Sequence, residues 1–218
     1  MVTERIHTKT IRSRIIPLYI IFYIAGLVIH LTPALNRFAE LTTLPVLLIS
    51  NIVVLLFLSG QISRKRLIPW LATAYLVTFF IEVTGVHTGA VFGSYYYGAM
   101  LGFSIFGVPL IIAFNWIILI LATYDMAGLM TKGRLFQPLL AALLIVVFDV
   151  IMEPVAMKLD YWHWQGGVIP LQNYIAWFII ALVFSFWLKL LKINPNSILL
   201  RAYLLIQAVF FLVLNIFL

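Results

Sequence analysis

Residues 136–158 have the sequence FQPLLAALLIVVFDVIMEPVAMK, and this stretch decides the fold class. It is long enough to cross a bilayer as a helix, which takes about 20 mostly apolar residues. We predict an all-α, polytopic membrane helix bundle with about seven transmembrane helices. The candidate spans are 15–31, 44–60, 67–85, 103–129, 136–158, 171–190 and 197–217.

The composition of the 218-residue chain supports a membrane protein. Hydrophobic residues make up 64% and charged residues 10%, whereas soluble domains have about 45–50% apolar and about 25% charged residues. The absence of Cys excludes disulfides, Cys-bound zinc and iron–sulfur clusters. A net charge of +7 suggests nucleic acid in a soluble protein, but here the basic residues flank apolar runs. They therefore set the topology, and we expect no nucleic-acid partner.

The distribution of Lys and Arg predicts the orientation of the bundle. Only Arg37 and Lys158 fall on one side of the predicted spans. The other twelve of the fourteen basic residues fall on the opposite side: Arg5, Lys9, Arg12, Arg14, Arg64, Lys65, Arg66, Lys132, Arg134, Lys189, Lys192 and Arg201. The positive-inside rule places the twelve in the cytoplasm, with the N-terminus inside and the C-terminus outside. We expect residues 1–14 to be a basic cytoplasmic N-terminal tail and residues 15–218 to be a single transmembrane helical domain.

Three acidic residues lie inside predicted spans: Glu82, Asp149 and Glu153. Ionisable residues in a membrane are costly, and they usually face an interior cavity. A rise of about 1.5 Å per residue places Glu82 and Glu153 at similar depths, with Asp149 one turn deeper. The alternative for any one of them is a helix–helix hydrogen bond. We expect all three to be catalytic groups in one pocket in the outer half of the membrane.

Two predicted outer loops adjoin this pocket and supply candidate substrate-binding residues. These candidates are His87, Tyr95, Tyr97, Trp162, His163 and Trp164, together with Asn115 near the middle of the fourth span. The aromatic residues are also typical of an interfacial belt, and a histidine is often structural. The fourth span contains Gly107 and Pro109, so we expect a kinked or re-entrant start. We expect Asp125 to cap a helix, to pair with Lys132 or Arg134, or to face water.

These residues form a pattern that resembles the carotenoid biosynthesis membrane-protein family, which includes carotenoid 1,2-hydratases. The resemblance covers roughly residues 70–190. It is carried by Glu82-x-x-Gly85-x-x-x-Gly89-x-x-x-Gly93-x-Tyr95-x-Tyr97, by Asp149-x-x-x-Glu153-Pro154-x-Ala156 and by Trp162-x-Trp164. It implies an enzyme, a hydro-lyase, that adds water across a terminal C1–C2 double bond of an acyclic carotenoid to give a tertiary alcohol.

The chemistry of this reaction suits the residue types. Protonation at C2 leaves a tertiary cation at C1, which water captures, and paired carboxyl groups supply the acid and the base. Aromatic faces stabilise cations. We expect no cofactor and no metal. The expected partners are a lipophilic carotenoid, water and membrane lipid, with possible association with other carotenoid-pathway enzymes. The expected location is the prokaryotic cell (inner) membrane.

Four other functions remain open at this point. A carotenoid end-group cyclase shares the protonation step but captures the cation with an alkene. A proton-coupled transporter uses intramembrane carboxylates as a proton relay. A metal-dependent prenyl transferase uses an acid pair such as Asp149 and Glu153 to bind magnesium. A non-haem iron enzyme uses His87, His163 and carboxylates as ligands.

Overall fold

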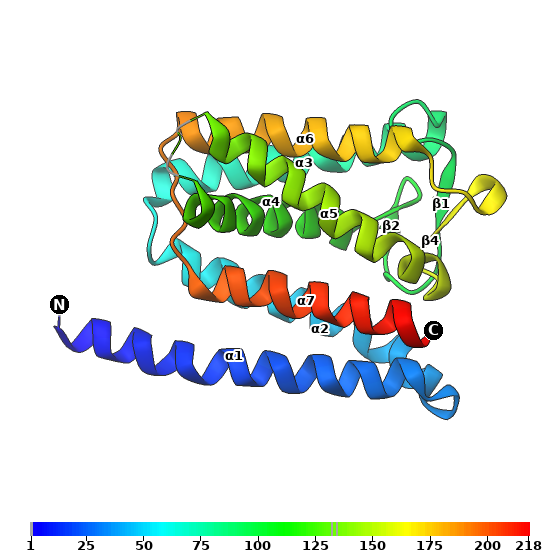
Figure 1. Ribbon diagram of the computed structural model, residues 1–218, viewed down its shortest axis with the longest axis horizontal. Coiled ribbons are helices and arrows are strands. Elements are labelled where there is room, and N and C mark those ends of the chain that lie inside the picture. The colour runs from blue at the N-terminus through cyan, green and yellow to red at the C-terminus, as the bar shows by residue number, and fades with distance from the viewer. Residues whose placement is uncertain (1, 132, 134) are drawn as a thin grey trace.

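Seven long helices form the bundle in the computed structural model, which describes residues 2–131, 133 and 135–218 (Figure 1). They are α1 (Val2–Leu31), α2 (Asn36–Ser59), α3 (Arg64–Thr88), α4 (Leu110–Met130), α5 (Phe136–Lys158), α6 (Leu171–Leu190) and α7 (Ile198–Phe217). Each of these seven has the length and the apolar composition of a membrane span. The all-α, seven-span prediction is therefore confirmed for the described part of the chain.

Short strands and 3-10 turns join the helices at one end of the bundle. Strand β1 (Tyr95–Tyr97) pairs antiparallel with β4 (Trp162–Trp164), and β2 (Ser104–Ile105) pairs with β3 (Val108–Pro109). The 3-10 turns are η1 (Pro33–Leu35) and η2 (Gln165–Gly167). The β1–β4 pair connects the segment after α3 with the segment after α5, so two distant parts of the chain meet there.

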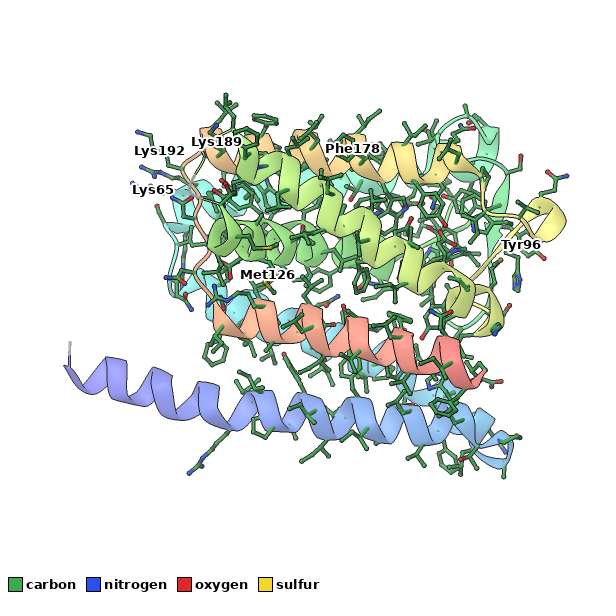
Figure 2. The ribbon with its side chains drawn as sticks, in the orientation of Figure 1. Lys65, Tyr96, Met126, Phe178, Lys189 and Lys192 are labelled. Atoms are coloured by element: carbon green, nitrogen blue, oxygen red, sulfur yellow. The ribbon has the colours of Figure 1, made fainter. Side chains whose placement is uncertain are left out.

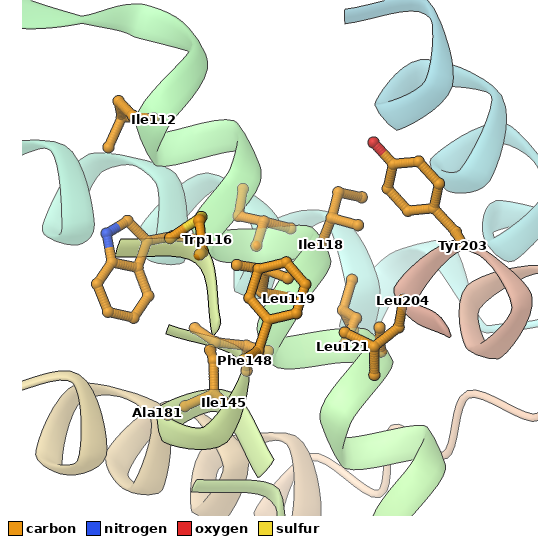
Figure 3. Close-up of a cluster of buried hydrophobic side chains, with 14 of the residues drawn as sticks. Ile112, Trp116, Ile118, Leu119, Leu121, Ile145, Phe148, Ala181, Tyr203 and Leu204 are labelled. Atoms are coloured by element: carbon orange, nitrogen blue, oxygen red, sulfur yellow. The ribbon is translucent and has the colours of Figure 1, made fainter. Parts of the chain in front are cut away.

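Helix α4 is the centre of the bundle, and α1 lies at its edge. In α4, 78% of the span residues are buried, against 11% in the α1 span. Helix α4 packs against α2, α3, α5, α6 and α7, whereas α1 lies beside α7 and α2 (Figure 1). Figure 3 shows the apolar cluster around α4, in which Trp116, Leu119 and Phe148 pack in the same core as Tyr203 of α7.

The predicted helix boundaries match the structure at some spans and miss it at others. Helices α5 and α6 have the bounds that the sequence predicts. Helix α2 begins at Asn36 rather than at residue 44. The predicted start of the fourth span at residue 103 is wrong, because the chain first forms the β2–β3 hairpin. Phe106 and Gly107 have φ of 53° and 77°, and two positive φ values are typical of a type I′ turn.

The ends of the bundle differ in charge as the sequence predicts. Figure 2 places Lys65, Lys189 and Lys192 at one end and Tyr96 at the opposite end. Helix α1 begins at one end, and α7 finishes at the other (Figure 1). Lys132 and Arg134 lie outside the described residues. The division into a tail of residues 1–14 and a domain of residues 15–218 stays a prediction.

Asp125 has a partner that the sequence analysis did not name. Its Oδ2 atom accepts hydrogen bonds from Nη1 of Arg201 at 2.9 Å and from the backbone N–H of Ser197 at 3.1 Å. The Asp125 side chain is only 3% exposed, so the expectation that it faces water is wrong. The ion pair joins the C-terminal part of α4 to the N-terminal part of α7, and the two residues lie 76 positions apart in the sequence.

We predict that Arg201→Met destabilises the protein by about 3–5 kcal/mol, because it leaves the buried Asp125 carboxylate without its counter-ion. The free energy of unfolding in detergent is the measurement. Lys65→Met, at an exposed position at the same end of the bundle, is the control and should change it little. The double variant Asp125→Asn/Arg201→Met should recover part of the loss. A single variant as stable as the control would contradict this role.

Candidate active site

The β1–β4 pair sets which aromatic side chains face the bundle. Tyr95 pairs with Trp164, and Tyr97 pairs with Trp162. Side chains alternate between the two faces of a strand, so these four residues share one face. Tyr96 and His163 share the other face, where their rings lie 5.2 Å apart.

Glu82, near the C-terminal end of α3, accepts hydrogen bonds from three donors. Its Oε2 atom accepts from the hydroxyls of Tyr95 at 2.5 Å and Tyr97 at 2.7 Å, and its Oε1 atom accepts from Nε1 of Trp116 at 2.7 Å. Gly85 lies one turn further along α3, where a Cβ would come within 3.1 Å of the Tyr95 hydroxyl oxygen. The same Cβ would meet the Phe92 ring first, at 2.7 Å, so the glycine leaves room both for that ring and for the Tyr95 hydroxyl beside Glu82.

The two tyrosine hydroxyls are suited to act as donors. Burial raises the pKa of both Tyr95 and Tyr97, and the negative charge of Glu82 raises it further. Both hydroxyls therefore keep their protons at neutral pH. As neutral groups, they donate hydrogen bonds to the Glu82 carboxylate.

Glu153 and Asp149 on α5 are linked by one side-chain amide. Nδ2 of Asn173 on α6 donates to Oδ2 of Asp149 at 2.8 Å and to Oε1 of Glu153 at 3.0 Å. Oε2 of Glu153 accepts from Nε1 of Trp162 at 2.9 Å and of Trp164 at 2.8 Å. Oδ1 of Asp149 is buried and has no hydrogen-bond partner among the described residues. The two carboxyl groups thus form a close pair with a single shared donor.

The two carboxyl centres meet at one cavity of about 330 Å³. Glu82 and Glu153 both line it, whereas Asp149, which shares the amide of Asn173 with Glu153, does not. Its walls are mostly aromatic and aliphatic, and the residues that surround the carboxyl groups are Phe92, Tyr95, Tyr97, Trp116, Trp162, Trp164 and Trp177. Figure 3 shows Trp116, Ile118, Leu119 and Phe148, which form part of the apolar wall. A mostly apolar cavity with a few convergent polar groups is typical of a small-molecule site.

The deeper part of the cavity has polar groups of its own. Nδ2 of Asn51 donates to Oδ1 of Asn115 at 2.7 Å, and the hydroxyl of Tyr203 donates to Oδ1 of Asn51 at 3.0 Å. All three residues line the cavity. Asn115 is therefore a cavity residue, as the sequence suggests, but its partner from α2 was not foreseen.

Two of the predicted substrate-binding residues do not face the cavity. His87 is exposed near the end of α3 and does not line it. His163 lies on the outward face of β4, where its Nε2 atom is 2.7 Å from Oδ1 of Asp160. This hydrogen bond lowers the pKa of Asp160, and a weaker contribution in the same direction comes from the backbone N–H of Ala99. Both histidines thus belong to the outer surface, because helix and strand geometry turns them away from the carboxyl groups.

Several functional candidates were missed by the sequence analysis. They are Trp116, Asn173, Asn51, Trp177, Gln207 and His30, all of which line the cavity. A signal existed for the amides, because a polar residue inside an apolar span usually faces the bundle interior. No comparable signal marked Trp116, since tryptophan also occurs in aromatic belts.

The donor groups around the carboxylates leave few oxygens free as metal ligands. Five of the six carboxyl oxygen atoms of Glu82, Asp149 and Glu153 accept hydrogen bonds from Tyr, Trp or Asn donors, and the sixth, Oδ1 of Asp149, has no partner among the described residues. Among the described residues, no three His, Asp or Glu side chains come together as a ligand set.

Comparisons with known proteins show the family of the chain. A family model described as carotenoid biosynthesis protein matches residues 42–218, so the chain belongs to that family. A bisanhydrobacterioruberin hydratase from Haloarcula japonica is 29% identical over 126 residues, which cover 51% of this chain and 42% of the relative. The match thus spans about two fifths of that relative's length. No solved structure matches the chain.

We predict that Tyr97→Phe lowers the free energy of unfolding by about 1–3 kcal/mol, because it removes a donor from the buried Glu82 carboxylate. Tyr96→Phe makes the same chemical change at the neighbouring position, which is 60% exposed on the outward face. That control should stay within about 0.5 kcal/mol of the parent. Thermal unfolding in detergent measures both. Equal effects of the two substitutions on the free energy of unfolding would contradict the assignment of Tyr97 to the strand face that contacts Glu82.

Proposed function

We propose that this protein is a carotenoid hydratase that adds water across a terminal C1–C2 double bond of an acyclic carotenoid. The observation that carries the proposal is that Glu82 and Glu153 both line one mostly apolar cavity. Such a cavity suits a hydrocarbon end group, and two carboxyl centres suit the two proton transfers of hydration. Membership of the carotenoid biosynthesis family and the similarity to a protein named a hydratase support the choice of substrate.

In the proposed reaction, the Asp149–Glu153 pair donates a proton to C2, and a tertiary cation forms at C1. A water molecule attacks C1 with its oxygen, and Glu82 accepts the proton that this water releases. The product is a tertiary alcohol, and the sum of the steps adds one water to the alkene. A proton then returns from Glu82 to the Asp149–Glu153 pair through water, which restores the starting state.

The hydrogen bonds support these roles. Two like charges that share the amide of Asn173 repel one another, so the Asp149–Glu153 pair favours holding one proton between its members. Glu153 is the member that lines the cavity, so it is the proton donor, and Asp149 positions and resupplies that proton. Glu82 and Glu153 each accept from three donors, which favours the carboxylate form, but Glu82 shares no donor with a second carboxyl group, so Glu82 is assigned the base.

The aromatic wall has a further part in the proposal. The rings of Tyr95 and Trp164 lie 5.1 Å apart, and one donates to Glu82 while the other donates to Glu153. Ring faces beside the cavity stabilise a cation by up to about 2 kcal/mol each when water is excluded. The proposed cation therefore forms between the two carboxyl centres.

The membrane location completes the proposal. The predicted orientation, with the N-terminus in the cytoplasm, places the carboxyl groups in the outer half of the bilayer. The carotenoid reaches the site from the lipid, and water reaches it from the outer face near the β1–β4 pair. We propose the prokaryotic cell membrane as its location.

We predict that Glu82→Gln and Glu153→Gln each lower hydration by about 10²-fold or more, the usual loss when a general acid or base is removed. Glu40→Gln, the same change at an exposed position of α2, is the control and should leave activity unchanged. Expression in a host that makes an acyclic carotenoid, with pigment mass measured, gives the readout.

The parent should add one or two waters to the pigment, and a chelator should not reduce the rate in purified protein. Hydration by a Glu82→Gln/Glu153→Gln double variant would contradict the proposed mechanism. An isomeric, ring-bearing product from the parent would indicate a cyclase instead.

A further inference from the structure

The cavity is too small for a whole carotenoid. Its volume is about 330 Å³, at the lower end of the range of about 300–1,000 Å³ for pockets that hold drug-sized molecules. The conjugated chain of a carotenoid is stiff and far longer than such a molecule. If an end group occupies the cavity, the rest of the chain has to leave it through an opening.

The wall formed by α7 is closed. The residues of α7 that line the cavity are all buried, and they are Tyr203, Gln207, Phe210 and Phe211. The lining residues of α5 and α6 are buried as well. The chain therefore cannot leave on these sides without moving core side chains.

The wall formed by α1 and α2 is open. Phe22 and Ala25 of α1 line the cavity, yet both are exposed on the surface of the molecule, Phe22 by 41%. Ile29 of α1 and Thr42 and Val46 of α2 also line the cavity and are partly exposed. The cavity thus reaches the surface between these two helices.

The packing of α1 explains why the opening faces α2. Phe22, Ala25 and Ile29 lie at spacings of three and four residues and share one helix face. Tyr23 lies on the adjoining face, and its ring packs against Phe210 of α7 at 5.3 Å. The face with Phe22 lies beside this contact, and it lines the same cavity as Thr42 and Val46 of α2.

The rim of the opening is mostly apolar and belongs to two helices with the length and composition of membrane spans. The rim residues of α1 fall within the span Arg14–Leu31. The hydroxyl of Thr42 donates to the backbone oxygen of Phe38 at 2.6 Å, so its proton is used within α2. With 11% of its span residues buried, α1 is also the least buried of the seven described spans. A hydrocarbon fits this rim, and a charged or strongly hydrated ligand does not.

We propose that the gap bounded by Phe22, Ala25 and Ile29 of α1 and by Thr42 and Val46 of α2 is a lateral portal. The end group of the carotenoid enters the cavity through it from the bilayer, and the rest of the polyene stays in the portal and the surrounding lipid. The identity of the occupant rests on the proposed function, whereas the opening itself does not.

The test compares two tryptophan substitutions on α1. Ala25→Trp fills the portal, and Ile24→Trp places the same ring at a position that is 55% exposed and does not line the cavity. Both proteins are reconstituted in lipid nanodiscs and given either a full-length acyclic carotenoid or a short acyclic isoprenoid with the same end group. Hydration and retained pigment are measured separately.

Ala25→Trp should slow hydration of the full-length carotenoid by about tenfold, the size expected for a bulky ring forced into a fitted gap. It should affect the short substrate much less. Ile24→Trp should stay within about twofold of the parent on both. Equal rates for the two variants on the long carotenoid, or an equal loss on both substrates, would overturn the portal.

Pigment retention separates failure of the portal from failure of the proposed function. If the parent retains carotenoid without hydrating it, the hydratase proposal fails. The portal still stands in that case if Ala25→Trp retains about tenfold less pigment than Ile24→Trp. Equal retention of pigment by the two variants contradicts the portal proposal. A parent that neither hydrates nor retains carotenoid contradicts both proposals.

Discussion

Three carboxyl groups buried in an apolar bundle, without a basic partner beside them in the described structure, are the constraint on which the site depends. Burying a charge is expensive unless the group is paired or hydrogen-bonded. Here neutral donors bind five of the six carboxyl oxygens: two tyrosine hydroxyls, three tryptophan N–H groups and one amide. Because four of these six donors come from β1 and β4, the carboxyl groups and the strand pair stabilise each other.

The same constraint shapes the cavity. Indole N–H groups only donate, so each tryptophan that binds a carboxylate also presents an apolar ring beside it. The site thus combines negative charge with hydrocarbon walls, which suits an apolar substrate that becomes positively charged. Asn173 adds a second feature, since its one amide nitrogen holds Asp149 and Glu153 together.

The sequence predicts the spans and much of the site, because apolar length and isolated acidic residues are local signals. It places α5 and α6 correctly and selects Tyr95, Tyr97, Trp162 and Trp164, which the cavity contains. It misplaces His163, because the strand pairing that turns it outward joins segments far apart in the chain. It misses the Asp125–Arg201 pair for the same reason, and the hairpin before α4 because residues 103–109 share the apolar character of the helix. Whether the selected residues act in catalysis stays a prediction.

The central claim is that a carboxyl group of the protein protonates the alkene before water adds. Isotopic labelling of the product tests this most directly. Purified protein is supplied with its acyclic carotenoid in heavy water, and the alcohol is analysed by mass spectrometry and NMR. The account predicts one non-exchangeable deuterium at C2, the carbon next to the new tertiary alcohol. A hydroxylated product without deuterium at C2 would contradict it, because the oxygen would then have arrived without protonation of the double bond.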